Sequence, residues 1–371
     1  MKFEPAAQSC LPPGGYASTC TLAEAAARVA RAGGGTRLLV THAKPDGDAL
    51  GCVMALQRTL HDLGIRADAV VVPPVPAPLR RLDGFERVEV WTESWAPPAD
   101  VDQVVVLDTG AWSQLGGLAP FVEANLGQTL IVDHHLGGDV AAPARFIDGG
   151  AAAACEIVAE LVQALVRPDF PEGRREGDAA GHKPLPAVTR DALFVGIASD
   201  TGWFRFSNVR PRTLELAAAL IRMGCDHAGL YGRLEQADRP EKLDLLARAL
   251  QSLIRMPDAD AAVMVLRARD FEQTGARPEE TERLIDVPQS VGSINVVVLL
   301  SEATGRGRTV TRMSFRSKPV GVDGRDPVNV AELAGRFGGG GHARAAGARQ
   351  DGPVDDVLPR VLEALRGLGV G

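Results

Sequence analysis

Short apolar runs that end in polar clusters dominate about the first 225 residues of the chain. Three of these runs, over residues 37–40, 103–107 and 129–132, have the length of buried strands. Three further stretches have the 3.6-residue apolar spacing of helices, and they cover residues 50–63, 151–166 and 189–199. This alternation predicts an open, doubly wound and mainly parallel α/β sheet, in which ligands bind at the carboxyl ends of the strands.

The beginning of the chain carries one helix signal and one irregular stretch. Thr21 and Glu24 form a capping-box pattern ahead of an Ala-rich segment that reaches Ala32, which predicts a helix that ends at Gly33. Residues 1–20 contain Pro, Gly and Ser without the basic start and apolar core of a secretory signal. We interpret them as a loose extension.

A second group of elements follows a polar excursion and a helix. Residues 167–186 are rich in Pro, Gly and charged side chains, which predicts an insertion into the first domain. A helix over residues 239–255 is predicted to connect two domains, and its apolar face consists of Leu243, Leu246, Leu250 and Leu253. We expect the first domain to cover residues 21–238 and a smaller mixed α/β domain to cover residues 256–371. The strands and helices predicted for the smaller domain lie at residues 261–266, 294–301, 309–315, 330–337 and 354–368.

Composition excludes several classes of protein. The 371 residues are 45% hydrophobic, which is enough apolar material for two cores, yet no apolar run approaches the roughly 20 residues of a membrane span. A net charge of -7 argues against a broad basic surface for long duplex nucleic acid. The five cysteines lack the paired spacing of a zinc site or a disulfide framework; they are Cys10, Cys20, Cys52, Cys155 and Cys225. We therefore expect a protein of the reducing cytoplasm.

The first predicted strand runs into a segment that holds an imidazole and two carboxylates within seven residues. His42, Asp46 and Asp48 lie in the sequence Thr-His-Ala-Lys-Pro-Asp-Gly-Asp, directly before a predicted helix. Because Asp46 and Asp48 flank a glycine, their side chains can face two different cations. An Asp before a helix is also a common N-cap, so the pattern leaves a capping role for Asp48 open.

Carboxylates follow the other predicted strands as well. Asp108 follows the second apolar run, and the third run ends in Asp133, His134 and His135. Asp200 lies in a Ser-Asp-Thr-Gly motif at the end of a predicted helix. If these ends meet, several carboxylates come together, and they repel one another unless some are protonated or a metal ion neutralises them.

This set of side chains favours a pair of first-row divalent ions. Carboxylate oxygens and imidazole nitrogens without a thiolate suit Mn²⁺, and a two-metal hydrolytic site lowers the pKa of a bound water to about 7. Such a site needs a bridging carboxylate, and Asp108, alone on its strand, fits that role. We expect it to have His42 and Asp46 on one side and Asp48, His134 and Asp200 on the other.

A Gly-rich segment is the main chemical feature of the second domain. Four consecutive glycines from Gly338 precede His342 and Arg344, and free backbone N–H groups there can bind an anion. A flexible linker is the alternative for such a run. Residues 303–350 carry nine Arg and Lys against three Asp and Glu, which favours a binding loop for phosphate. Arg316 in this stretch is a candidate phosphate ligand, with an ordinary solvated side chain as the alternative.

The order of the motifs resembles that of a known family. The chain contains, in sequence, His-x-x-x-Asp-x-Asp, a lone Asp, Asp-His-His, Ser-Asp-Thr-Gly and Gly-Gly-Gly-Gly-His. This series closely resembles the DHH phosphoesterases with a C-terminal DHHA1 domain, and the resemblance covers about residues 21–368. Residues 200–208 and 315–318 make the chain look most like the oligoribonuclease and phosphoadenosine-phosphate phosphatase branch, the nanoRNase type.

The resemblance implies roles for individual residues. The six metal ligands would be those named above, with Asp108 shared between two ions. His135 would contact the scissile phosphate, and Asp133 would orient the histidines. The phosphate or the nucleotide end would be held by Arg316, Gly339, Gly340, Gly341, His342 and Arg344. Cys52 and Lys44 stand where the family often has Ser and Asn, which affects only the expected substrate preference.

The activity expected on these grounds is that of a cytoplasmic phosphoesterase with two Mn²⁺ ions, in which an activated hydroxide attacks phosphorus in line. Its expected substrates are short single-stranded RNA or DNA and nucleotide bisphosphates, because the local basic charge suits few phosphates and only 5% of the residues are aromatic. A phosphodiesterase of cyclic or linear dinucleotides is one alternative, and a catalytically silent nucleotide-binding regulator is another. The sequence leaves open whether the protein is a monomer or a homodimer.

Overall fold

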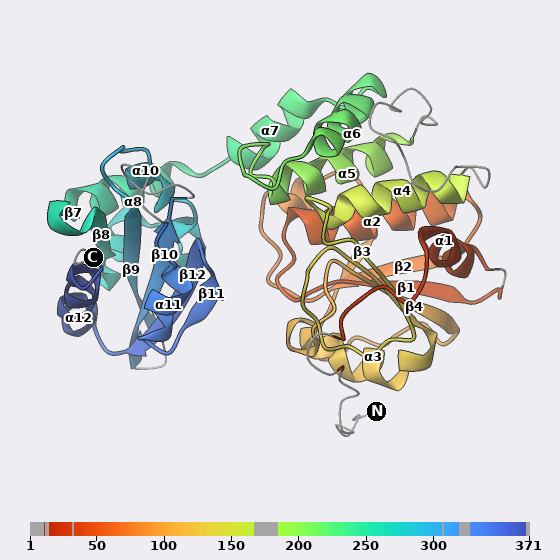
Figure 1. The fold of residues 1–371 in the computed structure, drawn as a ribbon, viewed down its shortest axis with the longest axis horizontal. Helices are drawn as coiled ribbons and strands as arrows, with labels where there is room; N and C mark the ends of the chain where they lie inside the picture. Colours follow the sequence, from red (N-terminus) through yellow and green to blue (C-terminus); the bar gives the residue numbers. More distant parts are fainter. Residues whose placement is uncertain are drawn as a thin grey trace. The chain divides into compact units, whose positions relative to one another are not determined.

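The computed structural model describes residue 11 and residues 15–31, 33–166, 185–305, 308–318 and 327–368. The chain forms two compact units, Met1–Ala237 and Asp238–Gly371, each of which is described by itself (Figure 1). The predicted insertion at residues 167–186 lies outside the described residues except for its last two. Within the described ranges, every helix is too short or too polar to cross a membrane.

Six parallel strands form the sheet of the N-terminal unit. They lie in the order β3-β2-β1-β4-β5-β6. Their bounds are Thr36–Val40 (β1), Ala67–Val71 (β2), Val88–Val90 (β3), Val101–Leu107 (β4), Thr129–Asp133 (β5) and Ala144–Ile147 (β6). The strand order reverses between β1 and β4, as it does in doubly wound folds, and this confirms the predicted fold class.

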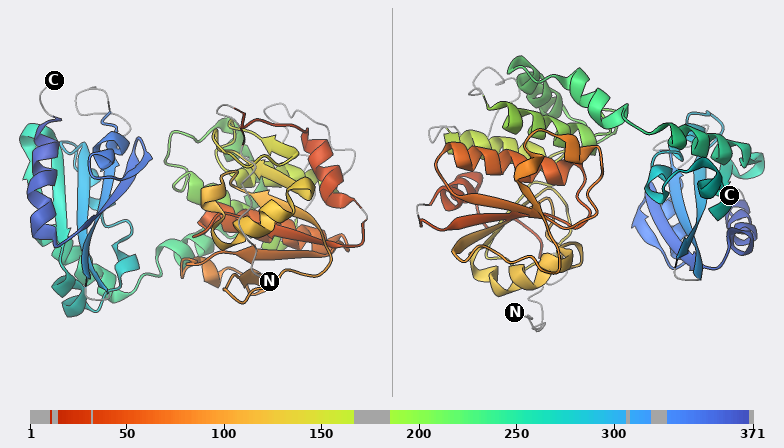
Figure 2. Two further views of the ribbon diagram at one scale, coloured as in Figure 1. Left: turned by 90° about the horizontal axis from the view of Figure 1, so that it is seen from below. Right: turned by 180° about the vertical axis from the view of Figure 1, so that it is seen from behind.

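Helices cover both faces of this sheet. Leu39 in β1 lies in the core on one face, whereas its neighbours Leu38 and Val40 lie in the core on the other. The first face is covered by α1 (Leu22–Ala30), α2 (Gly47–Asp62), α4 (Ala154–Val166) and α5 (Ala187–Asp200), and the second by α3 (Ala119–Ala124) (Figures 1 and 2). Helices α6 (Pro211–Arg222) and α7 (His227–Glu235) pack against α5. Burial on both faces explains why the strands read as continuous apolar runs.

The segment before α1 is packed against β6. The amides of Thr19 and Cys20 donate to the carbonyl of Arg145, and the side chain of Tyr16 is only 9% exposed. The expectation of a loose extension is therefore wrong for residues 15–20. It failed because these residues are held by contacts with distant parts of the chain, which leave no local pattern.

The start of α1 has the capping box that its sequence predicts. Thr21 Oγ1 accepts the Glu24 amide, and the Glu24 carboxylate accepts the Thr21 amide. Strands β2, β3 and β6 were not predicted, because their segments are short or half-polar. Helices α6 and α7 were not predicted either, although Leu216, Ala217 and Leu220 of α6 recur at helical spacing.

A mixed six-stranded sheet forms the C-terminal unit, in the order β11-β12-β10-β9-β8-β7. Its strands are Ile254–Met256 (β7), Ala261–Leu266 (β8), Val296–Gly305 (β9), Arg308–Ser317 (β10), Gly340–His342 (β11) and Ala345–Asp351 (β12). Only β8 and β9 run parallel among these neighbours. One face is covered by α11 (Val330–Gly335) and α12 (Val354–Arg366), the other by α8 (Pro240–Gln251) and α9 (Ala268–Thr274), and the short α10 is Asp286–Gln289. The predicted smaller mixed α/β domain is confirmed.

Helix α8 belongs to the C-terminal unit and does not stand between two domains. Leu245 and Ala249 are fully buried against the sheet, whereas Leu243 is 69% and Leu250 38% exposed. The prediction of a connecting helix over residues 239–255 is therefore wrong, because α8 packs on the core of the C-terminal unit. The residues that it buries most deeply, Leu245 and Ala249, are not among the four leucines of the predicted apolar face.

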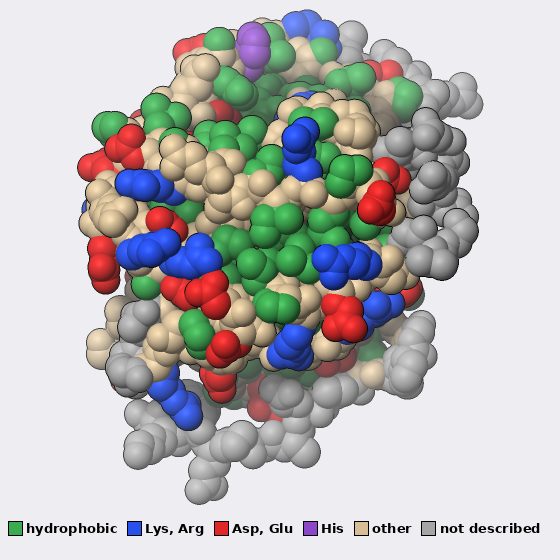
Figure 3. All heavy atoms as spheres, turned by 90° about the vertical axis from the view of Figure 1, so that its left-hand side faces the viewer, with side chains coloured by type: hydrophobic (Ala, Val, Ile, Leu, Met, Phe, Trp, Pro, Cys, Tyr) green, Lys and Arg blue, Asp and Glu red, His purple; other side chains and the backbone are tan. Residues whose placement is uncertain are grey.

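Figure 3 looks onto the face of the C-terminal unit that carries β7 and α12. Hydrophobic side chains gather in the middle of this face, and charged side chains surround them. Ile254 and Met256 of β7 and Leu358 and Leu362 of α12 pack on the core while remaining partly exposed.

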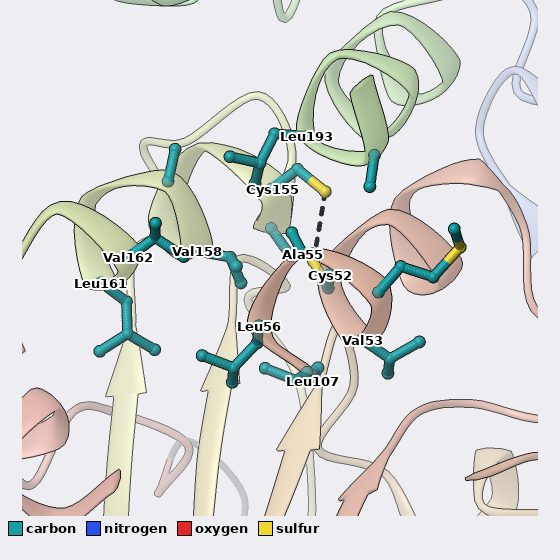
Figure 4. Packing of buried hydrophobic residues seen from close by; sticks show 14 of the residues in the cluster. Cys52, Val53, Ala55, Leu56, Leu107, Cys155, Val158, Leu161, Val162 and Leu193 are labelled. Carbon is teal, nitrogen blue, oxygen red and sulfur yellow. Dashed lines mark hydrogen bonds between the residues drawn. The ribbon is translucent and has the colours of Figure 1, made fainter. Parts of the chain in front are cut away.

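Two thiols face each other in the core of the N-terminal unit. Cys52 of α2 and Cys155 of α4 are fully buried, and their Sγ atoms lie 3.5 Å apart among aliphatic side chains (Figure 4). Burial raises the pKa of both thiols, so they remain protonated at neutral pH. They act as small apolar groups where α2 meets α4.

Candidate active site

The predicted site residues of the N-terminal unit gather where the strand order reverses. His42 follows β1, Asp108 follows β4, and His134 and His135 follow β5. Asp200 ends α5, which packs against α2. The carboxyl ends of neighbouring parallel strands meet at one edge of the sheet, so residues far apart in the sequence become neighbours.

Asp108 lies at the centre of this cluster. Its side chain is almost fully buried, with Oδ2 3.6 Å from His42 Nε2 and Oδ1 3.5 Å from His134 Nε2. Oδ1 accepts no hydrogen bond from any residue that the structure describes. A buried carboxylate oxygen without a partner is unfavourable unless a cation faces it. The two oxygens of Asp108 face different ligand candidates: Oδ2 faces His42, and Oδ1 faces His134.

The rings of His42 and His134 are oriented by backbone carbonyls. His42 Nδ1 lies 3.0 Å from the Ala43 oxygen, and His134 Nδ1 lies 3.3 Å from the Ala151 oxygen. A carbonyl only accepts, so Nδ1 donates in both rings, and Nε2 of each ring is directed toward the carboxylates. A histidine held in this way can bind a metal ion through Nε2.

The ring of His135 is oriented by a carboxylate. Its Nδ1 donates to Asp133 Oδ1 at 2.7 Å, and the amides of His134 and His135 donate to the same oxygen. The hydrogen bond with Asp133 raises the pKa of His135 to about 9. Asp133 is fully buried; burial raises its pKa, but the hydrogen bonds and charge of His135, together with the bond from Tyr16, outweigh this and hold the pKa below its usual range.

Two aspartates at the start of α2 have different hydrogen-bond partners. Asp46 Oδ1 accepts the amides of Asp48 and Ala49, so Asp46 is the N-cap of α2. Asp48 is buried and accepts the amides of Ala154 at 2.6 Å and Cys155 at 2.9 Å, at the start of α4. The capping role that the sequence left open for Asp48 in α2 thus belongs to Asp46. The carboxylate of Asp48 instead lies at the positive end of α4.

Close helix packing brings Asp200 to the cluster. Its Oδ2 lies 3.5 Å from His134 Nε2. A Cβ on Gly47 would lie 2.5 Å from Ser199 Oγ, so only glycine lets the start of α2 approach the end of α5 this closely. This approach places Asp200 beside the other carboxylates.

The electrostatics of the cluster favour a bound cation. Burial and the charge of Asp46 raise the pKa of Asp48 to about 6, and burial and the charge of Asp48 raise that of Asp200 to about 7. The same two causes raise the pKa of Asp108 well above its usual range. Burial lowers the pKa of His42, but its bonds with Asp108 and Asp46 outweigh this and raise it to about 11. The site accumulates negative charge that the chain alone neutralises incompletely.

The donor set can hold two divalent ions. In each of two groups, the ligand atoms lie within 4.8 Å of one another; the groups are His42, Asp46 and Asp108, and Asp48, His134 and Asp200. Oxygen and imidazole donors, two Nε2 atoms directed toward the carboxylates and the unpartnered oxygen of Asp108 fit Mn²⁺ or a similar first-row ion.

The predicted substrate residues of the C-terminal unit lie on neighbouring strands. Arg316 of β10 pairs with Ala345 of β12, and Ala345 pairs with His342 of β11. Directly paired residues of an antiparallel sheet share a face, so Arg316 and His342 lie on the same face in one row. Arg344, in the turn between β11 and β12, donates to the carbonyl of Val328.

The Gly-rich segment is a strand and turn rather than a linker. Gly340 and Gly341 belong to β11, which pairs with β12. A Cβ on Gly339 would overlap the carbonyl of Gly347, and a Cβ on Gly341, whose φ is 144°, would lie 2.6 Å from the Ala345 oxygen. Glycine is required here for backbone approach, and the exposed backbone stays open to a ligand.

Two residues at the site were missed by sequence reasoning. Tyr16 Oη donates to Asp133 Oδ2 at 2.5 Å, although the sequence around Tyr16 shows no period or motif. Burial and the charge of Asp133 raise the pKa of Tyr16, so the hydroxyl stays protonated. Asn208 Nδ2 donates to the carbonyls of Ala152 and Asp200 and fixes the end of α5. Asn208 lies in the stretch that carries the family resemblance, but spacing alone does not identify its partners.

Comparison with known proteins identifies the family. Residues 37–197 match the DHH family, N-terminal domain. The bifunctional oligoribonuclease and PAP phosphatase NrnA of Thermus thermophilus is 30% identical over 341 residues, which is 92% of each chain. The chain belongs to the DHH family. It is a hydrolase of phosphate ester bonds, as the order of its motifs predicted.

Further relatives extend the likeness of this DHH-family enzyme to both units. The protein of the same name from Bacillus subtilis is 24% identical over 315 residues, or 84% of this chain and 88% of that one. The crystal structure of an exopolyphosphatase-related protein from Bacteroides fragilis superposes with a TM-score of 0.78 at 19% identity, over 94% of this chain and 96% of that one. That protein therefore shares the fold. The DHH match at residues 37–197 ends before Asp200 and before the C-terminal unit.

Proposed function

We propose that this chain is a divalent-metal-dependent phosphoesterase that releases mononucleotides from short oligoribonucleotides and removes a phosphate from 3'-phosphoadenosine 5'-phosphate. The observation that carries the proposal is the position of Asp108, whose two oxygens face two separate groups of ligand candidates. The substrate class is supported by the relatives, whose names give oligoribonuclease and PAP phosphatase activity.

Six side chains would hold the metal ions. Asp108 would be shared, with His42 and Asp46 on one side and Asp48, His134 and Asp200 on the other. When bound, the two ions supply a water-derived nucleophile at neutral pH and stabilise charge on the phosphate. The amides at the start of α4 keep the Asp48 carboxylate in place before any ion arrives.

The chain's own groups would orient the phosphate. His135 is bonded through Nδ1 to Asp133, so its Nε2 is free to donate to a phosphate oxygen. In the C-terminal unit, Arg316 and His342 would hold a second phosphate or the nucleotide end. The backbone of Gly339, Gly340 and Gly341, together with Arg344, would add donors to the same group.

A substrate panel tests the proposal. Di- to pentanucleotides of RNA and DNA, 3'-phosphoadenosine 5'-phosphate, a cyclic dinucleotide and its linear product are each incubated with Mn²⁺, with Mg²⁺ or with chelator. We expect mononucleotides from the short RNAs and AMP from the bisphosphate. The rate should be highest with Mn²⁺, and no product should form with chelator. Turnover confined to the cyclic dinucleotide, or equal turnover with chelator, would refute the proposal.

A further inference from the structure

One side chain of the N-terminal segment lies directly behind the histidine pair. Tyr16 Oη donates to Asp133 Oδ2 at 2.5 Å, and Asp133 Oδ1 accepts Nδ1–H of His135 at 2.7 Å. Two hydrogen bonds thus connect Tyr16 to the imidazole ring. We propose that Tyr16 is a positioning residue that holds Asp133, and through it His135, in the orientation needed for phosphate ester hydrolysis, an inference that rests on the function proposed above.

The surroundings of Tyr16 keep its ring in one place. A Cβ on Gly110 or on Gly138 would overlap the ring, so the backbone of both glycines forms the walls of its pocket. On either side of Tyr16, the amides of Leu11 and Thr19 donate to carbonyls of the N-terminal unit, at Asp139 and Arg145. A side chain confined in this way can fix the rotamer of its partner, whereas an exposed tyrosine cannot.

The partners of Asp133 explain why the hydroxyl matters. Oδ1 accepts three hydrogen bonds, from the amides of His134 and His135 and from the His135 ring. From the described residues, Oδ2 accepts one, and its donor is Tyr16. Without that hydroxyl, a fully buried carboxylate oxygen loses its partner, so the carboxylate can turn away from the His135 ring.

The kinetic test removes the hydroxyl and keeps the ring. Tyr16→Phe is expected to lower kcat on a dinucleotide on the order of 10-fold, while KM and the Mn²⁺ concentration for half-maximal activity change less than about twofold. The matched control is Tyr231→Phe, because Tyr231 is the other tyrosine of the chain and is 40% exposed. It is expected to leave both constants unchanged. An unchanged kcat in Tyr16→Phe would overturn the inference.

A second substitution separates positioning from packing. In a His135→Ala background, Tyr16→Phe is expected to cause no further loss, because the ring that it positions is gone. An equal loss in both backgrounds would mean that the hydroxyl acts only through general packing, and the inference would be wrong.

A spectroscopic test does not depend on turnover. In the full chain with Mg²⁺, the ¹⁵N resonance of His135 Nδ1 is expected to shift in Tyr16→Phe and to stay in place in Tyr231→Phe. An unmoved resonance in Tyr16→Phe contradicts the inference. If the wild-type chain hydrolyses none of the panel substrates, the proposed function fails, yet this resonance still decides whether Tyr16 orients His135.

Discussion

The two units hold their functional side chains in different ways. In the N-terminal unit, Asp48 is buried with two amide donors, and the His134 ring is anchored on a carbonyl. In the C-terminal unit, His342 is exposed, and Arg316 donates to the adjacent carbonyl of Phe315. The residues proposed as metal ligands are thus held in place by burial and hydrogen bonds, whereas the residues proposed to bind the substrate keep some contact with solvent.

The largest expected effect is the loss of the shared carboxylate. Asp108→Ala should lower kcat/KM on the order of 10³-fold, because the proposed function assigns Asp108 to both ions. Mononucleotide release in the presence of Mn²⁺ is the measurement. The matched control is Asp102→Asn at the other end of β4, where Asp102 pairs with Arg37 at 2.8 Å. The control should lower stability and leave activity intact; an active Asp108→Ala would contradict the bridging role.

A substitution in the row formed by Arg316, Ala345 and His342 should act on substrate binding. Arg316→Ala should raise KM at least about 10-fold with little change in kcat, because a charge-assisted bond to phosphate contributes about 1.5–3 kcal/mol. Steady-state kinetics on a dinucleotide and on 3'-phosphoadenosine 5'-phosphate measure the effect. Arg312→Ala is the control, since Arg312 is exposed on the same strand. A fall in kcat with an unchanged KM would contradict a role for Arg316 in substrate binding.

The repulsion among the buried carboxylates should appear as a pH-dependent stability. Burial raises the folded-state pKa of Asp48 to about 6 and of Asp200 to about 7, against about 3.9 in the unfolded chain. The metal-free folded protein therefore binds protons more tightly than the unfolded chain between about pH 4 and 7. Its free energy of unfolding should fall as pH rises through this window. The raised pKa values of His42 and His135 act in the same direction above about pH 6.5.

Thermal unfolding with chelator and with Mn²⁺ measures this effect. Mn²⁺ should raise Tm by more at pH 7.5 than at pH 5, with a difference on the order of a few degrees. Asp48→Asn removes one of the carboxylates and should flatten the pH dependence of the metal-free protein. A metal-free protein that gains stability from pH 5 to pH 7.5 would show that these carboxylates do not repel one another.

The smallest effect is expected for a substitution of Cys52, which lies next to Asp48. Cys52 Sγ lies 3.9 Å from Asp48 Oδ1 and 3.5 Å from Cys155 Sγ, so a hydroxyl at this position can donate to the same carboxylate. Cys52→Ser should change kcat/KM by less than about twofold and stability by about 1 kcal/mol. Cys225→Ser, at a buried thiol that lies elsewhere in the unit, is the control. A loss of more than tenfold would mean that the thiol itself matters for the reaction.

Much of the fold follows from local patterns. The runs at residues 37–40, 103–107 and 129–132 became β1, β4 and β5, because strands buried on both faces are continuously apolar. The capping box of Thr21 and Glu24 starts α1 as predicted. The leucine pattern of α8 misled, because Leu243 fits the helical period and yet faces solvent. A period identifies a helix more reliably than it identifies the face that packs.

The amino-acid sequence alone specifies which residue types follow each strand, and therefore the family and the chemistry available at the sheet edge. Which of these residues meet depends on the folded chain: Asp48 accepts amides at the start of α4, and Tyr16 donates a hydrogen bond to Asp133. Strand ends and helix caps depend on residues adjacent in the chain, so local patterns reveal them. Hydrogen bonds between segments more than 100 residues apart depend on packing that no local pattern records.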